Sequence, residues 1–283
     1  IAALKLWSVD PNAVKLSTQT SADIAVAAGT PVKLQIVLPG QRRDPGSSSG
    51  KTGPVAAQAP GAYITARVHL VDANWNEVDS SSPTVRVESE NSGSDYVILS
   101  SAKVLSLGDG GYESWAGADR LRIYNSTGST ALRAVNVDAP GSAYSDDVSS
   151  TFTLTAATQT LSNLFVLLPD QAHVPGKWHS PSGNVQPNGT VVTFTGAAGG
   201  KQGLPDAPFT SGTPKAGDNF LVRAFATDQY WNPISTDAVT TMAPVKPAGA
   251  AGDTTPNQIQ TMIAGTTDYT FFLRAAKPGW KFQ

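Results

Sequence analysis

The feature that most restricts how this chain folds is an internal repeat made of two short motifs. An apolar run ending in Leu-Pro-x-Gln occurs at residues 34–41 and again at residues 164–171, an offset of 130. The pattern Asp-x-x-Trp-Asn occurs at residues 72–76 and again at residues 228–232, an offset of 156. Two motifs that recur in the same order indicate two copies of one structural unit. The larger second offset predicts an insertion in the second copy, at about residues 175–215.

A period of two dominates the hydrophobic pattern around these motifs. Apolar and polar residues alternate through residues 63–71, as they do in a half-buried β-strand. The same period recurs over residues 32–38, 84–88, 120–124, 132–137, 151–155, 191–195, 220–225 and 269–273. With 26 glycines and 20 prolines to form turns, the pattern predicts an all-β chain of two tandem immunoglobulin-like antiparallel β-sandwich domains.

The alternation also predicts which side chains form the two cores. The first core is expected to contain Leu34, Ile36, Leu38, Ile64, Ala66 and Val68. The second core is expected to contain Phe165, Leu167, Leu221 and Phe225. Trp75 and Trp231 occupy equivalent places in the repeat, so we expect both to be substantially buried. Trp7, Trp115 and Trp280 have strand-like surroundings and are assigned to a core or an interface.

Composition limits the partners and the location of the protein. Only 15% of the residues are charged and the net charge is −2, so no basic surface for nucleic acid is expected. No apolar run approaches the roughly 20 residues of a membrane span. The absence of cysteine excludes disulfides and thiolate chemistry. Together with the Ser, Thr, Gly and Ala bias, these features favour an extracellular or cell-surface protein of a bacterium or archaeon.

The motifs also resemble those of a known group of proteins. A strand ending in Leu-Pro-x-Gln, a Gly/Pro-rich stretch at residues 44–53 and an alternating strand running into Asp-x-x-Trp-Asn resemble the tandem bacterial immunoglobulin-like repeats of large secreted and cell-surface proteins. The resemblance covers most of the chain. It implies a structural role in stalks, adhesins, fibres or envelope layers, without a shared chemistry. The long insertion and the incomplete second copy depart from the pattern.

The repeat divides the chain into an N-terminal strand segment at residues 1–30, a first domain at residues 31–160 and a second domain at residues 161–283. The second copy is expected to lack its closing strand, and the N-terminal segment matches the missing length to within two residues. Residues 1–10 also resemble the strand at residues 131–138.

This complementarity predicts a contact between copies of the chain. An open sheet edge recruits an added strand, so we expect the N-terminal strand of one copy to complete the second domain of its neighbour. The other interpretation is one period of a longer array. The expected subunit-contact residues are Ile1, Leu4, Leu6, Trp7, Val9, Tyr269, Phe271, Trp280 and Phe282.

The sequence predicts no enzyme and no cofactor. The pattern Gly-x-Ser-x-Gly occurs at residues 46–50, but the segment after it is rich in Pro and Ala, whereas a nucleophile elbow leads into a helix. Gly50-Lys51-Thr52 lacks the first glycine of a phosphate loop at the required spacing. The glutamates have no pattern that would bring two of them together for glycoside hydrolysis; they are Glu77, Glu88, Glu90 and Glu113.

Two groups of polar residues are candidates for metal ligands. Asp72, Asn74 and Asn76, like Asp228 and Asn232, offer oxygens for calcium, but Asp and Asn in such spacing also form turns, and we favour the turn. The histidines are too few for a zinc site. His69 is expected on the solvent face of its strand, and His173 and His179 are expected to form a surface pair.

The insertion contains the residues expected to contact a ligand, Trp178 and His179, with surface glycans as the partner. Asn125 and Asn188 begin Asn-x-Thr glycosylation patterns in expected turns. The sequence therefore favours a non-catalytic structural subunit of an extracellular filament, stalk or cell-envelope layer, which assembles with copies of itself. The alternative is an adhesion or carbohydrate-binding module, or a segment of a giant tandem-repeat surface protein.

Overall fold

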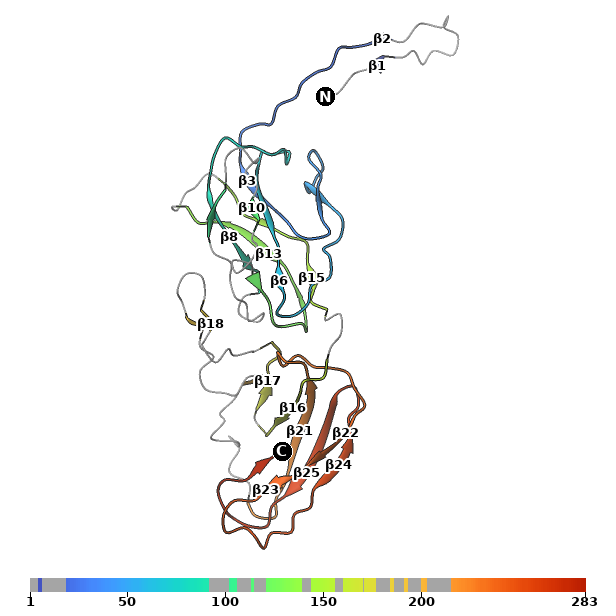
Figure 1. Cartoon of the computed structure of the whole chain (residues 1–283), viewed down its shortest axis with the longest axis vertical. Coiled ribbons are helices and arrows are strands. Elements are labelled where there is room, and N and C mark those ends of the chain that lie inside the picture. The colour runs from blue at the N-terminus through green and yellow to red at the C-terminus, as the bar shows by residue number, and fades with distance from the viewer. Residues whose placement is uncertain are drawn as a thin grey trace, which may run out of the picture.

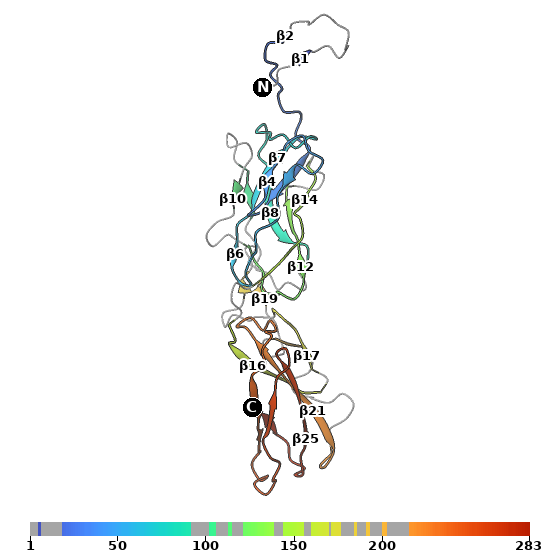
Figure 2. The ribbon, with the colours of Figure 1, turned by 90° about the vertical axis from the view of Figure 1, so that its right-hand side faces the viewer.

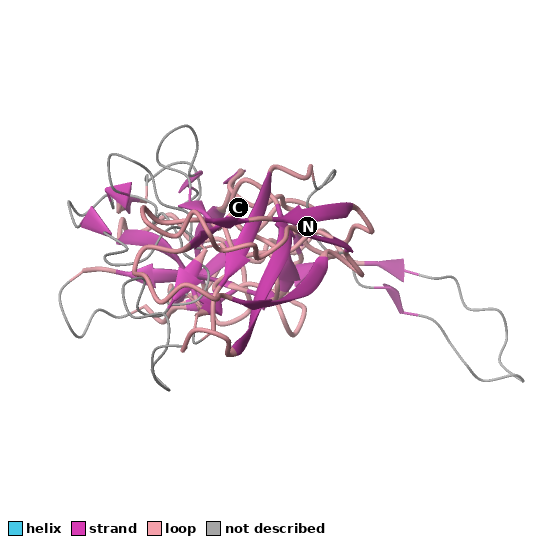
Figure 3. Cartoon of the chain, turned by 90° about the horizontal axis from the view of Figure 1, so that it is seen from below, coloured by secondary structure: helices cyan, strands magenta, loops and turns pink. Residues whose placement is uncertain are grey.

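The computed structural model describes residues 5–6, 19–91, 102–105, 113–114, 121–138, 144–155, 160–169, 171–176, 184–185, 191–192, 200–202 and 215–283. In these ranges all regular structure is β-strand and no helix occurs (Figure 3), so the prediction of an all-β chain is confirmed. The ribbon forms a first lobe, residues 31–155, and a second lobe, residues 160–283, arranged end to end (Figures 1 and 2). A hairpin of β1 (Lys5–Leu6) and β2 (Gln19–Thr20) projects from the end of the first lobe that points away from the second.

Two antiparallel sheets form the first lobe, with strand orders β10-β7-β3 and β14-β13-β8-β9. Short pairs β4-β5, β6-β11 and β12-β15 accompany them. The bounds are β3 (Lys33–Val37), β4 (Arg42–Arg43), β5 (Lys51–Thr52), β6 (Tyr63–Ile64), β7 (Arg67–Val71), β8 (Thr84–Ser89), β9 (Lys103–Val104), β10 (Glu113–Ser114), β11 (Leu121–Arg122), β12 (Ser129–Thr130), β13 (Leu132–Asn136), β14 (Asp147–Val148) and β15 (Phe152–Thr153).

The core of the first lobe lies between these sheets. Alternate residues of β3 and β7 point inward, and those of β8 and β13 face them from the other sheet. All six residues predicted for this core are buried, namely Leu34, Ile36, Leu38, Ile64, Ala66 and Val68.

A segment that we call the closing segment, residues 144–155, completes the first lobe. The Leu34 amide donates to the Ser145 carbonyl at 2.9 Å, and the Ser145 amide donates to the Val32 carbonyl at 3.1 Å. Further along the segment β14 pairs with β13, and Phe152 and Leu154 are buried in the core. The closing segment therefore covers the outer edge of β3 and joins it to the opposite sheet.

The second lobe has a three-stranded sheet of order β16-β21-β25 and the antiparallel pairs β22-β24 and β23-β26. Pairs β17-β20 and β18-β19 belong to its insertion region. The bounds are β16 (Asn163–Leu167), β17 (Ala172–His173), β18 (Asn184–Val185), β19 (Val191–Val192), β20 (Lys201–Gln202), β21 (Asn219–Thr227), β22 (Val239–Met242), β23 (Pro244–Val245), β24 (Gln258–Thr261), β25 (Thr266–Phe272) and β26 (Lys281–Phe282).

The core prediction for the second lobe is wrong by one residue in register. Phe165 and Leu167 are buried, but they pair with Phe225 and Arg223 on the opposite face of the sheet, and Leu221 is 54% exposed. The core contains Val222, Ala224, Ala226, Met242, Met262, Tyr269 and Phe271. Because side chains alternate along a strand, a slip of one residue exchanges the two faces.

Candidate functional site: the open edge of the second lobe

Corresponding strands can be matched between the lobes from their pairing. β3 and β16 begin the two units at an offset of 130, and each pairs with the long strand that leads to the Asp-x-x-Trp-Asn turn. The cross-strand pair Thr84 and Val104 recurs as Thr240 and Gln260, an offset of 156 at both positions. The first lobe therefore shows which contacts each strand of the second lobe makes when the unit is closed.

The main difference lies at the outer edge of the first strand. In the first lobe the closing segment binds this edge of β3 through Ser145. In the second lobe β16 is the edge strand of its sheet, and no described residue pairs with its outer edge. An edge of this kind presents free N–H and C=O groups to another strand.

The core of the second lobe is exposed beside this edge. Leu164 corresponds to Leu34 and faces the same side as Val166, because the two pair with Ala226 and Ala224 of the core. Leu34 is 0% exposed, whereas Leu164 is 57% exposed. The open edge of the second lobe therefore combines unpaired backbone with an uncovered apolar side chain.

The last strand of the second lobe is present in part, which corrects the expectation that it would be missing. β26 pairs with β23, and the Gln283 backbone exchanges hydrogen bonds of 2.8 and 3.1 Å with Ala243. The same ladder in the first lobe pairs Leu132–Ala134 of β13 with residues 87–89. The counterpart of the closing segment is the part that no described residue supplies.

The predicted contact residues fall into three groups. Tyr269 and Phe271 are fully buried in the second core, with the Tyr269 hydroxyl 2.5 Å from Thr240 Oγ1, so their side chains are not surface contacts. Trp280 and Phe282 are half-buried, and Phe282 packs on the core. Leu6 belongs to β1; the other predicted residues, Ile1, Leu4, Trp7 and Val9, lie outside the described residues.

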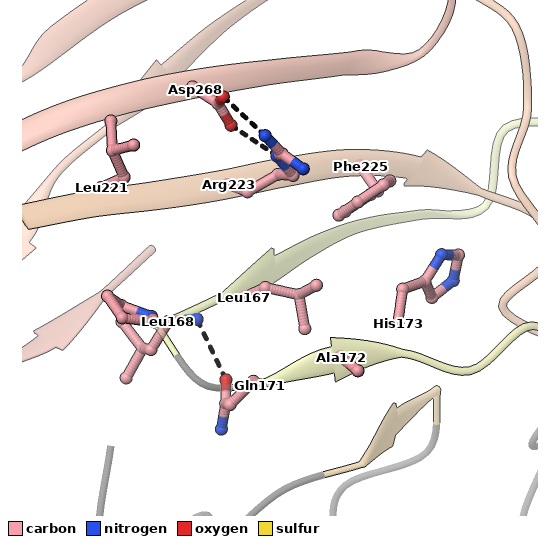
Figure 4. Close-up of a pocket in the computed structure, with 10 residues that line it drawn as sticks. Leu167, Leu168, Gln171, Ala172, His173, Leu221, Arg223, Phe225 and Asp268 are labelled. Carbon is pink, nitrogen blue, oxygen red and sulfur yellow. Dashed lines mark hydrogen bonds and ion pairs between the residues drawn. The ribbon is translucent and has the colours of Figure 1, made fainter. Parts of the chain in front are cut away.

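The glutamine of the Leu-Pro-x-Gln motif binds the closing segment in the first lobe. Gln41 Oε1 accepts the Leu38 amide at 3.2 Å, and its Nε2 donates to Ser150 Oγ at 3.0 Å. In the second lobe Gln171 Oε1 accepts the Leu168 amide at 3.0 Å in the same way (Figure 4). No described hydroxyl takes the place of Ser150 there. The sequence pattern identifies this glutamine only as part of the repeat and does not reveal its contact with the closing segment.

The two lobes meet end to end (Figure 1), and side chains from both contact each other there. Asn232, fully buried, donates from Nδ2 to the Tyr124 carbonyl at 2.8 Å and accepts the Ser126 amide on Oδ1 at 3.0 Å. The rings of Tyr124 and Tyr230 lie 5.1 Å apart. Gly61 faces the Tyr230 ring so closely that a Cβ would lie 2.3 Å from it. Only glycine fits this position.

Both Asp-x-x-Trp-Asn motifs form the same turn. Asp72 Oδ1 accepts the amides of Asn74 and Asn76 at 2.8 and 2.9 Å, and Oδ2 accepts Asn76 Nδ2 and the Gly29 amide. Asp228 accepts the corresponding bonds from Tyr230 and Asn232. N–H donors therefore occupy the carboxylate oxygens that a calcium site would use, and the described residues contain no cluster of acidic or histidine ligands.

The turn also controls the ionisation of its aspartate. Burial opposes the charged form of Asp72, but the hydrogen bonds from the Asn76 side chain and from the Gly29, Asn76 and Asn74 amides outweigh it. They lower the pKa of Asp72 to about 2. The carboxylate is thus a structural anion at neutral pH.

The tryptophans of the two turns occupy equivalent places. Trp75 and Trp231 both have φ of 68° and are half-buried, less than the substantial burial we expected. Each packs on a glycine: a Cβ would approach Trp75 to 2.3 Å at Gly50 and Trp231 to 2.7 Å at Gly200. The tryptophans therefore hold the β4-β5 and β17-β20 hairpins against their sheets.

The expectation that His69 faces solvent is wrong. His69 is buried, with Nδ1 2.7 Å from Glu77 Oε1, and Arg43 donates to Glu77 and to Gln35 Oε1. Burial lowers the pKa of His69 despite its bond to Glu77. The β4-β5 hairpin covers this outer face of the sheet, which strand periodicity alone does not reveal.

The same space in the second lobe is aromatic. Phe165, His173 and Phe225 occupy the positions of Gln35, Arg43 and His69 at the repeat offsets, with ring centroids 4.8 to 6.3 Å apart. His173 Nε2 lies 2.7 Å from the Trp231 carbonyl, and burial lowers its pKa. His173 is thus a packing residue, and His179, its expected surface partner, lies outside the described residues.

A hollow of about 430 Å³ opens between β17 and the outer face of β16 and β21 (Figure 4). Its lining includes Leu167, His173, Leu221 and Phe225, with the Arg223–Asp268 ion pair at one side, 2.6 Å at its shorter contact. These lining residues contain no nucleophile with an adjacent base. The hollow therefore has an apolar lining with one ion pair at its side.

Other predicted residues are placed as follows. Asn125 lies at the junction between the lobes, where its Oδ1 accepts the Thr127 amide at 2.9 Å and the Thr127 hydroxyl at 2.7 Å. Trp7, Trp115, Trp178 and Asn188 lie outside the described residues.

Comparison with known proteins identifies no relative: the chain matches no family model, no curated protein and no solved structure. In the described residues no helix is long and apolar enough to cross a membrane.

Proposed function

We propose that this chain is a non-catalytic structural subunit of an extracellular filament, stalk or cell-envelope layer, built from two immunoglobulin-like repeats whose copies join head to tail. The observation that carries the proposal is the open edge of β16. There the outer backbone has no partner strand among the described residues, and Leu164 is 57% exposed where its counterpart Leu34 is 0% exposed. The composition supports an extracellular location, because the chain has no cysteine and few charges.

An added strand would both pair with the backbone of this edge and cover Leu164. The contact joins the second lobe of one copy to the N-terminal segment of the next, so the two surfaces differ. Such a heterologous contact repeats without limit unless its rotation closes a ring. Figure 1 places the hairpin of β1 and β2 and the second lobe at opposite ends of the chain, which favours an open polymer.

The test is polymerisation of the purified full chain, followed by electron microscopy and sedimentation. The native chain should form filaments, and Leu164→Arg should prevent them by placing a charge where the added strand packs. Ile259→Arg is the matched control, because Ile259 is 68% exposed on β24, away from this edge. A native chain that stays monomeric, or a Leu164→Arg chain that polymerises normally, refutes the proposal.

A second candidate, adhesion to glycans, is favoured by the hollow beside β17. Leu221 and Phe225 give it an apolar face, and the Arg223–Asp268 pair supplies polar groups at its side. A glycan screen comparing the native chain with Leu221→Ser and Trp178→Ala tests this function. Binding that both variants weaken supports it, and an absence of any bound glycan rejects it.

A further inference from the structure

We infer that the N-terminal segment of one copy closes the second lobe of its neighbour, with residues 19–25 in the register that residues 149–155 have in the first lobe. This inference rests on the proposed head-to-tail assembly and names the segment that makes the contact. The offset between the two segments is 130, the same as between the two Leu-Pro-x-Gln motifs that follow them. Each segment therefore stands at the same distance before the first strand of the lobe that follows it.

The side-chain amide of Gln171 fits this register. In the first lobe Gln41 Nε2 donates to Ser150 Oγ of the closing segment. At the offset of 130, Ser150 corresponds to Thr20, which also has a hydroxyl group. Gln171 Oε1 accepts the Leu168 amide as Gln41 Oε1 accepts the Leu38 amide, so in this register Gln171 Nε2 donates to the hydroxyl of an incoming Thr20 as Gln41 Nε2 donates to Ser150.

Ile24 supplies the apolar side chain that this register requires. Its counterpart Leu154 is buried in the first core, where alternate residues of the closing segment point inward. Every residue from 20 to 30 is exposed, including Ile24 at 48% and Val26 at 84%. An exposed apolar residue on an extended segment is suited to fill a core that another copy leaves open.

The structure contradicts the expectation that residues 1–10 form the closing strand, because Lys5 and Leu6 pair with Thr20 and Gln19 of their own chain. This two-residue pairing has to open when Thr20 enters the neighbour. At an offset of 130, residues 1–4 correspond to residues 131–134. The second lobe supplies the counterpart of this stretch itself, as β26 and Gln283 paired with residues 243–245. The missing strand therefore corresponds to a later part of the N-terminal segment.

The end of the second lobe that contains Gly217 also favours insertion of the N-terminal segment of another copy. The Gly61 amide donates to the Ile123 carbonyl at 2.7 Å, and the Gly217 amide donates to the Leu273 carbonyl at 2.7 Å, so the two glycines are equivalent. Both have positive φ, +69° and +93°. Tyr230 covers Gly61, whereas a Cβ at Gly217 would have nothing within 4 Å. The receiving end of the second lobe is thus built like the one inside the chain, and no described residue covers Gly217 there.

A second copy fits this uncovered end through its own Asp-x-x-Trp-Asn turn. Asn74 corresponds to Tyr230 and is exposed, and Asn76 corresponds to the junction residue Asn232. The Gly29 amide donates to Asp72 at 2.8 Å, so Gly29 is fixed to the Asp72 turn of its own first lobe. Only a short connection separates Gly29 from residues 19–25. When residues 19–25 enter the neighbour's second lobe, this connection therefore brings the Asp72 turn next to that lobe. The junction between copies then repeats the junction between lobes.

Cysteine cross-linking measures the register directly, because the chain contains no cysteine of its own. Ser149 and Leu132 bond through their backbones in the first lobe, and their counterparts are Gln19 and Lys281. A Gln19→Cys, Lys281→Cys chain should form a ladder of covalent multimers under mild oxidation, as should Asn74→Cys, Gly217→Cys. Gln19→Cys with Val239→Cys is the control and should give no ladder, since Val239 lies on β22 away from the open edge.

Ile24→Asp supplies the second measurement. It should raise the concentration needed for polymerisation by at least about ten-fold, because a charge replaces a buried apolar side chain. Ile259→Asp, the same change at an exposed isoleucine of β24, should leave it unchanged. Filaments that tolerate Ile24→Asp, and that give no ladder in the Gln19→Cys, Lys281→Cys chain, overturn this register while the proposed function stands. A chain that forms no filaments overturns both.

Discussion

Replacing Asn232 by alanine removes the side chain that joins the two lobes, and its repeat partner Asn76 provides a matched control. Asn232 makes three side-chain bonds: Nδ2 to the Tyr124 carbonyl at 2.8 Å, Nδ2 to Asp228 Oδ2 at 2.9 Å, and Oδ1 from the Ser126 amide at 3.0 Å. Asn76 is half-buried, and its side chain makes the equivalent bond to Asp72 Oδ2 at 2.9 Å. The two substitutions therefore differ in the interlobe bonds.

The expected difference follows from the bonds that are lost. A net contribution of about 0.5–1.5 kcal/mol per hydrogen bond gives about 1 kcal/mol for Asn76→Ala. Asn232→Ala loses that bond and two more, the bonds to the Ser126 amide and to the Tyr124 carbonyl at the junction between the lobes. Its loss of unfolding free energy should be about 2–4 kcal/mol.

Denaturant unfolding monitored by tryptophan fluorescence measures both losses, because Trp75 and Trp231 lie within the two turns. The full chain should carry Ile24→Asp in every variant, so that all are compared unassembled. The transition of the second lobe should shift most in Asn232→Ala. Equal losses for Asn76→Ala and Asn232→Ala would show that the junction between the lobes contributes no stability, and the reasoning about its repetition between copies would fail with it.

Two further predictions concern stability. Gly61→Ala should destabilise the chain by more than Gly46→Ala: both glycines have positive φ, but a Cβ at Gly61 meets the Tyr230 ring at 2.3 Å and one at Gly46 meets nothing within 4 Å. Thermal unfolding of the two variants checks the order, and equal melting points would contradict it. The lowered pKa of Asp72, about 2, means that its contribution to stability is complete above its ordinary pKa of 3.8 and is lost as the pH falls toward 2. Unfolding free energies measured between pH 5 and 2 should fall less steeply for Asp72→Asn than for the native chain, and parallel curves would refute the assignment.

The sequence alone predicted the strands and the first core because local alternation determines them. Leu34, Ile36 and Leu38 alternate with polar or outer-face residues, so the inward face of β3 is unambiguous. In β16 every residue from Leu164 to Leu168 is apolar, and alternation cannot choose a face. The repeat offset does choose, since it matches Leu164 and Val166 with Leu34 and Ile36.

The outer faces of the sheets were harder to predict because a hairpin distant in sequence covers them. His69 alternates as a solvent-facing residue should, yet β4 and β5 fold over it. The sequence does contain a signal for this cover, because two cross-strand partners differ together between the repeats. Gln35 and His69 are both polar in the first repeat, whereas their counterparts Phe165 and Phe225 are both aromatic in the second. Residues that change together at facing positions indicate a shared, covered space.

In the proposed polymer a covalent connection crosses both kinds of junction, the one between lobes and the one between copies, and this affects the strength of the polymer. Within the chain, the closing segment of the first lobe continues without interruption into the second lobe, so a covalent connection crosses the junction beside the Asn232 contacts. Between copies, residues 19–25 lie in the neighbour's second lobe and continue into their own first lobe, so a covalent connection crosses that junction too. Separating two copies then requires the strand to leave the core, and this loses both its backbone pairing and the burial of Ile24. Asparagine is smaller than tyrosine, so in the proposed junction Asn74 would cover less of Gly217 than Tyr230 covers of Gly61. We therefore expect the inserted strand to provide most of the strength of the junction between copies.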